Sequence, residues 1–207
     1  MPIIAHGPRA PCFRPVNYLA HTLLADPTPH GLAGSLLGDF WHGATDPDWP
    51  HELAHGVMLH RRIDSATDRH PEFVAMRARL PSSLRRYAGI VLDVGFDFVL
   101  TRQWPQHSAL TLRAHVDAVN HALREFANAA YAPPAFAQFA RHAVAVDLLA
   151  RYGEVATMQR AFHSLSRRLA RGNPIATAWD ALEPLLPTLE SALPPLLADL
   201  RNVRVDP

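Results

Sequence analysis

The sequence predicts an all-α fold in which a single-domain helical bundle holds one apolar core. From Asn17 onward, nearly every segment repeats its apolar residues at the spacing of a helix. No Asn-Gly or Asp-Gly pair joins two alternating runs, so the strongest local signal of a β-hairpin is missing. The 19 Pro residues fall mostly between the helical segments, and they therefore separate helices rather than indicate disorder.

Capping residues and prolines mark where most of the predicted helices begin and end. Asp26-Pro27 ends the first helix, Pro71 opens the fourth, and Pro105 stops a longer fifth helix that Ser82 or Ser83 can cap. Residues 26–30 and 43–50 are predicted loops. The expected helices cover residues 17–25, 32–40, 51–66, 71–80, 82–104, 108–130, 135–151 and 154–171, and after Asn173 a last pair interrupted near Pro184, Pro187 and Pro194-Pro195.

Length and charge narrow the class of protein further. A chain of 207 residues suits one domain with a sizeable core, which we place at residues 17–207. Its 20 basic residues, all Arg, nearly balance 19 acidic residues, which argues against binding to nucleic acid or a membrane surface through net charge. No run of about 18 apolar residues is present, so a membrane-spanning helix is not expected.

The first 16 residues differ from the rest of the chain. Residues 1–16 contain four Pro and no sustained periodicity, so we expect a disordered tail or an extension ahead of the domain. Cys12, the single cysteine, lies in this stretch. One cysteine cannot form an intramolecular disulfide, and a cytoplasmic location is therefore the default expectation.

Two aspartates lie where the sequence predicts a buried helix. Residues 90–100 are apolar around the whole helix surface except at Asp93 and Asp97. Their spacing of four places both carboxylates on one face, about 6 Å apart along the helix axis. Two negative charges in a dry core raise each other's pKa and need compensation. The compensation predicted is a divalent metal ion or, alternatively, Arg side chains or helix N-termini.

A second spacing of four occurs at His60 and Asp64, and Asp68 extends the row if the helix continues. An imidazole nitrogen and a carboxylate oxygen one turn apart can bind one metal ion. The same spacing is also common in surface pairs, which is the alternative here. Arg61 and Arg62 point elsewhere on the helix and could face an anionic partner.

Two further polar residues stand in apolar surroundings. His21 ends the segment NYLAH, and Asp39 closes the segment SLLGDF. Taken alone, the first suits a hydrogen-bonded core histidine and the second suits a helix cap. Imidazole and carboxylate ligands without thiolate are typical of Mn, Fe, Mg or Zn ions in hydrolysis. The candidate metal ligands are His21, Asp39, His60, Asp64, Asp93 and Asp97.

Arginines are concentrated in residues 61–86, where the chain has seven of them and three acidic residues. The overall charge balance hides this local excess. Such a segment could bind a phosphate-bearing ligand or an acidic protein through bidentate contacts. The alternative is the solvated face of two amphipathic helices. The arginines are Arg61, Arg62, Arg69, Arg77, Arg79, Arg85 and Arg86.

Four motifs, in this order and spacing, resemble those of the acyl carrier protein phosphodiesterase family. They are NYLAH at 17–21, SLLGDF at 35–40, HRRID at 60–64 and LDVGFDFVL at 92–100. The resemblance continues through residues 149–171 and weakens over the last 35 residues. Members of the family typically begin near the Asn of NYLAH, so Val16 would occupy the position of the initiator and residues 1–16 would be an extension.

The resemblance implies a cytoplasmic, Mn²⁺-dependent hydrolase that removes the 4′-phosphopantetheine group from holo acyl carrier protein. It also implies a fold similar to the helical HD-type phosphohydrolases. All six candidate ligands fall on motif positions of the family. The chain departs from the family pattern at one position, where members read Asp-His-Phe-Leu and this chain has Asp97-Phe98-Val99-Leu100. If that histidine acts in the reaction, the activity would be weakened, absent or altered in substrate.

The mechanism expected for such a hydrolase combines a metal ion with nearby charged groups. The ion would lower the pKa of a bound water and polarise a phosphoryl oxygen. Asp64 or Asp97 would accept the proton of the water, and Arg61 or Arg62 would offset charge on the phosphoryl oxygens. Carrier proteins are strongly acidic, so residues 61–86 would dock one. Two alternatives stay open, an HD-type hydrolase of a nucleotide or small phosphoester and a noncatalytic module that binds acyl carrier protein.

Overall fold

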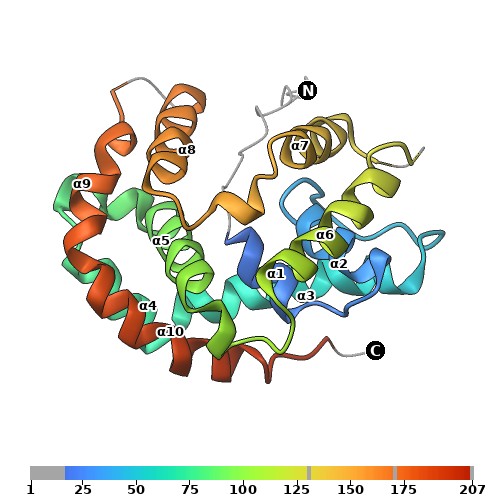
Figure 1. The fold of residues 1–207 in the computed structure, drawn as a ribbon, viewed down its shortest axis with the longest axis horizontal. Coiled ribbons are helices and arrows are strands. Elements are labelled where there is room, and N and C mark those ends of the chain that lie inside the picture. The colour runs from blue at the N-terminus through green and yellow to red at the C-terminus, as the bar shows by residue number, and fades with distance from the viewer. Residues whose placement is uncertain (1–16, 130–131, 170–171, 206–207) are drawn as a thin grey trace, which may run out of the picture.

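The computed structural model describes residues 17–129, 132–169 and 172–205, and within these ranges it contains helices and loops but no strand (Figure 1). This confirms the all-α class, whereas the predicted tail at 1–16 lies outside the described residues. No helix in these ranges has the length and apolar character needed to span a membrane. The α-helices are α1 (Tyr18–Leu24), α2 (Pro29–Leu37), α3 (His51–Arg69), α4 (Pro71–Arg79), α5 (Ala88–Gln103), α6 (Leu112–Phe126), α7 (Pro134–Ala145), α8 (Val155–Arg168), α9 (Ala178–Leu182) and α10 (Leu186–Leu200).

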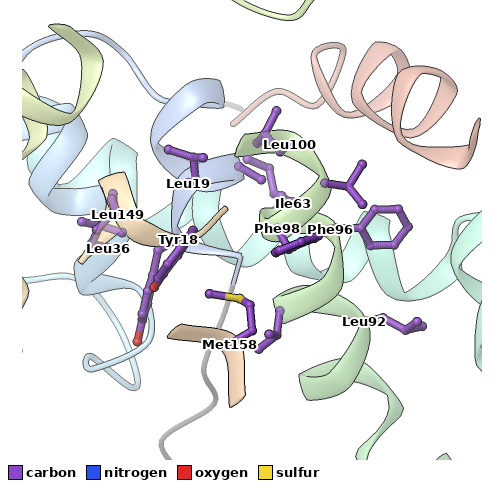
Figure 2. Close-up of a cluster of buried hydrophobic side chains, with 14 of the residues drawn as sticks. Tyr18, Leu19, Leu36, Ile63, Leu92, Phe96, Phe98, Leu100, Leu149 and Met158 are labelled. Atoms are coloured by element: carbon purple, nitrogen blue, oxygen red, sulfur yellow. The ribbon is translucent and has the colours of Figure 1, made fainter. Parts of the chain in front are cut away.

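Helix α5 lies at the centre of the bundle and contacts α1, α4, α9 and α10. Its buried side chains point in every direction around the helix, as its apolar sequence predicts. Figure 2 shows Leu92 and Phe96 of α5 in the same apolar cluster as Leu19 of α1 and Ile63 of α3. A polar side chain on the α1 side of α5 is therefore enclosed by the protein.

Helices α2 and α3 pack closely because glycines face each other where they meet. A Cβ atom at Gly56 would lie 2.8 Å from the carbonyl oxygen of Gly31 and 3.0 Å from the Cα of Gly34, which is too close for any larger residue. The absence of side chains at these positions lets the two backbones touch. This contact brings the last turn of α2 next to the middle of α3.

Two boundaries predicted from proline positions are wrong. Helix α2 begins at Pro29 rather than residue 32, because the Thr28 side chain accepts a hydrogen bond from the backbone of Gly31 and Pro29 occupies the first turn. Helix α10 continues through Pro194 and Pro195, where we expected an interruption. Pro194 cannot donate to the carbonyl of Glu190, and the Gln103 side chain donates to that carbonyl at 3.5 Å instead.

The predicted helix over 135–151 divides into α7 and a short 3₁₀ turn, Leu149–Arg151. The chain breaks at Asp147, whose φ of 50° lies in the left-handed region. The carboxylate of Asp147 accepts hydrogen bonds from Arg113 and Asn120 of α6. Contacts with another helix thus stabilise a bend that local periodicity does not indicate.

Candidate metal centre

Three side chains able to bind a metal ion converge where α1 meets α3. His21 lies on α1, and His60 and Asp64 lie one turn apart on α3. Each offers one ligand atom, and these atoms all lie within 4.8 Å of one another. Both histidines are buried, whereas 30% of the Asp64 side chain is exposed. The structure therefore brings together three predicted ligands from two helices, with solvent access at Asp64.

The His60 ring is oriented by a backbone carbonyl. Its Nδ1 atom donates to the carbonyl oxygen of Ser35 on α2, 2.6 Å away. Its Nε2 atom lies 3.4 Å from Asp39 Oδ1 and 3.4 Å from Asp64 Oδ2. A metal-binding histidine usually has its other ring nitrogen bonded to a carbonyl or carboxylate, which fixes the tautomer. Nε2 is thereby directed at two predicted carboxylate ligands, Asp39 and Asp64.

His21 contacts the same group from the side of α1. Its Nε2 atom lies 3.0 Å from Asp64 Oδ1, and its ring stacks on His60 with 3.9 Å between the ring centroids. Its Nδ1 atom is buried and has no hydrogen-bond partner among the described residues. Buried polar atoms without a partner are rare because they cost free energy. This observation argues against a fully hydrogen-bonded core histidine.

The two histidines have opposite pKa shifts. Burial lowers the pKa of His60, but bonds to Asp39 and Asp64 outweigh it and raise the value to about 10. Burial and the neighbouring His60 lower the pKa of His21 to about 4. Burial acts to raise the pKa of Asp64, yet the bonds to both rings hold it far below its usual value. The carboxylates thus favour a positive charge at His60 Nε2.

Asp93 adds a further carboxyl group close to this cluster. It lies on α5 and is partly buried. Burial raises its pKa well above the usual value, and the negative charges of Asp64 and Asp39 raise it further. Asp93 lies outside the group of three whose ligand atoms meet within 4.8 Å. It is nevertheless near enough that a negative charge on it would be repelled by the negative charges of Asp64 and Asp39.

Asp97 has a different environment from Asp93. Its Oδ2 and Oδ1 atoms accept hydrogen bonds from the backbone N–H groups of Leu19 and Ala20, at 2.9 and 3.0 Å. These groups belong to the first turn of α1, where backbone donors have no partner within the helix. Burial raises the pKa of Asp97 to about 8, against the opposing effect of the two N–H bonds. A helix N-terminus, one of the compensations predicted, therefore contacts Asp97.

The donor set suits a divalent cation. Imidazole nitrogens and carboxylate oxygens are available together, and no thiolate takes part. Several carboxylates surround one histidine whose pKa is raised, so the cluster has an excess of negative charge. A doubly charged ion would offset this excess. The group of His21, His60 and Asp64 is therefore compatible with a divalent metal ion, without identifying which one.

Comparisons with known proteins agree with the motifs that supply this cluster. The model of a family described as acyl carrier protein phosphodiesterase matches residues 16–200. The chain belongs to the acyl carrier protein phosphodiesterase family. This confirms the resemblance inferred from the four motifs and the expected class of enzyme.

Similar proteins from two bacteria carry the name of this family. Proteins named acyl carrier protein phosphodiesterase from Enterobacter sp. (strain 638) and Escherichia coli (strain K12 / DH10B) are 31% and 30% identical to it over 185 residues. The aligned part covers 85% of this chain and 91% of each relative. No solved structure matches the chain, so the likeness to HD-type phosphohydrolases stays a prediction.

Phe98 is the position at which the chain departs from the expected pattern of the acyl carrier protein phosphodiesterase family. Its side chain is buried, and its ring packs edge-on against Trp179 of α9 with 5.1 Å between the centroids. Successive residues of a helix point about 100° apart, so position 98 is turned away from the row of Asp93 and Asp97. The substitution therefore removes no ligand from the group of His21, His60 and Asp64.

Arg61 and Arg62 donate hydrogen bonds to backbone carbonyls of other segments of the chain. The guanidinium of Arg61 donates to the carbonyl oxygens of Trp41 and Gly43, at 2.6 and 2.7 Å. Arg62 donates to the carbonyl oxygen of Arg204 at 2.7 Å. Arg61 thus holds the loop after α2 against α3, and Arg62 holds the C-terminal segment.

Sequence reasoning missed two contributors to the cluster, the Ser35 carbonyl and Gly38. A Cβ atom at Gly38 would overlap the ring of His60, so the absence of a side chain there makes room for the imidazole. Both residues belong to the motif SLLGDF, from which only Asp39 was selected. A glycine within a predicted helix is a signal of close approach that could have identified Gly38, whereas a backbone carbonyl has no signature in the sequence.

Proposed function

We propose that this protein hydrolyses the phosphodiester that links 4′-phosphopantetheine to holo acyl carrier protein, and so produces the apo protein. The observation that carries the proposal is the convergence of two buried histidines, His21 and His60, with the partly exposed Asp64, which a packed helical core alone does not require. Membership of the acyl carrier protein phosphodiesterase family supports the choice of substrate. A cytoplasmic location belongs to the same proposal.

We assign a divalent ion, for which Mn²⁺ is our first choice, to His21, His60 and Asp64, with Asp39 and Asp93 completing the set. When bound, such an ion supplies a Lewis acid for a phosphoryl oxygen and the attacking water. The low pKa of Asp64 keeps this residue anionic at neutral pH. The bond to Ser35 keeps one hydrogen of His60 on Nδ1, so Nε2, which is protonated in the metal-free protein, would release its proton to solvent and present its lone pair to the ion.

From the sequence, Asp64 and Asp97 were both candidates to accept the proton of the water, and we now assign them different tasks. Asp97 is buried and bonded to two backbone N–H groups, so we assign it the positioning of α1 and of His21 on it. Asp64 is the exposed member of the metal-binding group, so it is the carboxylate that a water molecule can reach. Because its pKa is low, we expect it to be a weak proton acceptor and electrostatic stabilisation to contribute more to the rate.

We assign the task of offsetting transition-state charge to a cation other than Arg61 or Arg62. Both guanidinium groups are bonded to backbone carbonyls, and these bonds hold loops in place. The proposal therefore gives the task of offsetting phosphoryl charge to the metal ion. This differs from the role that the sequence suggested for the two arginines.

The test is to incubate the full-length protein with holo acyl carrier protein and Mn²⁺ and to follow the intact mass of the carrier. The expected result is loss of the mass of 4′-phosphopantetheine, abolished by chelation of the metal and by the substitution Asp64→Asn. Unchanged carrier mass under conditions in which a family member from Escherichia coli is active would overturn the proposal. Hydrolysis of nucleotides without carrier protein would instead assign a different phosphoester substrate.

A further inference from the structure

A basic groove lies between the C-terminal end of α7, the turn Leu149–Arg151 and helix α8. Its volume is about 930 Å³. In Figure 1, α7 and α8 stand on either side of the chain segment that connects them. The basic residues of its lining are His142, Arg151, Arg160, His163, Arg167 and Arg168.

The charge of this groove has one sign along most of its length. Neither α7 nor α8 contains an acidic residue. Glu154, in the connection before α8, bonds to Arg151 and lies 3.9 Å from Arg160. Arg167 has no ion pair among the described residues, and its side chain is exposed. The groove therefore presents more positive charge than its own acidic residue can balance.

The exposed basic residues of α8 form a row. Arg160, His163 and Arg167 are spaced by three and four residues, so they share one face of the helix. From Arg160 to Arg167 the row spans about 10 Å along the helix axis. The opposite face of α8, with Met158, Phe162 and Leu165, is buried in the core. A linear array of this length matches carboxylates on successive turns of a partner helix better than a single small anion.

The groove reaches the neighbourhood of the metal-binding group. Tyr152 lines the groove and is buried, and the negative charges of Asp97 and Asp39 help to raise its pKa. Burial raises the pKa of Tyr18, the first residue of α1, and the positive charge of Arg168 acts to lower it. Tyr18 also packs on Phe139 of α7, with 4.7 Å between the ring centroids. The basic residues thus flank the side of the protein on which α1 carries His21.

We propose that this groove docks an acidic face of a partner protein, through carboxylates that contact Arg160 and Arg167. The proposal that the partner is acyl carrier protein rests on the proposed function. The docking surface proposed here differs from the one predicted from the sequence, which was residues 61–86. Arg61, Arg62, Arg69 and Arg79 of that segment are bonded to other parts of this chain, and Arg86 packs over the ring of Tyr87.

The first test measures binding of fluorescently labelled holo acyl carrier protein by anisotropy, without added metal, so that no hydrolysis is needed. The double variant Arg160→Glu/Arg167→Glu should bind at least tenfold more weakly than the unmodified protein. Arg124→Glu is the matched control, an exposed arginine on α6 outside the groove, and should bind normally. Higher salt should weaken binding of the unmodified protein and have less effect on the double variant. Circular dichroism checks that both variants fold.

Three outcomes would overturn the docking surface. One is normal binding by the double variant Arg160→Glu/Arg167→Glu. Another is weakened binding by Arg77→Glu/Arg85→Glu but not by that variant, which would place the docking surface at residues 61–86. The third is equal or tighter binding to single-stranded RNA of similar charge, which would indicate an anion site without preference for a protein.

A second measurement separates this inference from the proposed function. Hydrolysis of a small diester, bis(4-nitrophenyl) phosphate, with Mn²⁺ should be the same in the double variant and the unmodified protein. Hydrolysis of holo acyl carrier protein should show a raised KM in the double variant with little change in kcat. If the unmodified protein binds the carrier through this groove but never changes its mass, the docking surface stands and the proposed hydrolysis fails.

Discussion

The Nδ1 atom of His60 lies 2.6 Å from the carbonyl oxygen of Ser35, and this contact ties a side chain of α3 to the last turn of α2. It leaves Nε2 facing Asp39 and Asp64, each 3.4 Å away. The close packing of α2 on α3, which their glycines allow, makes the contact possible. The geometry of the metal-binding group therefore depends on helix packing as much as on the ligands themselves.

Gly38→Ala should weaken metal binding without removing a ligand. The new methyl group would overlap the His60 ring and turn it away from Asp39 and Asp64. We expect the affinity for Mn²⁺ to fall by about 10- to 100-fold, as for other changes that misplace a ligand. Isothermal titration calorimetry measures this. The control is Gly89→Ala, since a Cβ atom there meets nothing within 4 Å, and a similar loss in the control would contradict the packing argument.

Asp97→Asn should destabilise the protein and displace His21. The substitution replaces one of the two oxygens that accept these N–H groups by an amide NH₂, which cannot accept the second bond. We expect a loss of about 1–3 kcal/mol in the free energy of unfolding, measured with urea. Asp117→Asn, at an exposed position of α6, is the control and should change stability by less than about 1 kcal/mol. Unchanged stability in Asp97→Asn would remove the positioning role.

His115 should make stability depend on pH below neutrality. It is buried, its Nε2 lies 3.0 Å from the Thr22 hydroxyl, and burial lowers its pKa. The unfolded chain therefore binds a proton more readily, and this contribution to stability is lost as pH falls below about 6.5. His115→Gln keeps a polar group near Thr22 without a titrating ring, so its urea midpoint should change less between pH 7.5 and 5.5. An identical pH dependence in both proteins would exclude His115 as a source.

Phe98→His, which restores the residue expected from the family pattern, should not increase activity. The side chain at 98 packs on Trp179 and is turned away from Asp93 and Asp97. Burying an imidazole there should cost about 1–3 kcal/mol of stability. The rate of carrier hydrolysis at saturating Mn²⁺ checks the prediction. A clear gain in kcat would show that position 98 acts in the reaction after all.

The sequence predicts the members of the candidate metal-binding group better than it predicts their neighbours. His60 and Asp64 were found from a spacing of four on a predicted helix, because helical geometry alone places them on one face. Asp97 was found for its burial, but sequence could not choose between a metal ion and the N–H groups of Leu19 and Ala20, which come from another helix. The partners of Arg61 are backbone carbonyls, which every residue has, so the sequence does not indicate which of them it contacts.

The central claim is that His21, His60 and Asp64 hold a divalent metal ion, and a Mn²⁺ titration of the purified, metal-free protein tests it most directly. The unmodified protein should show saturable binding by calorimetry. Asp64→Asn and His60→Gln should each lower the affinity by about 100-fold or more, while circular dichroism shows that both still fold. Normal Mn²⁺ binding by both folded variants would contradict the account.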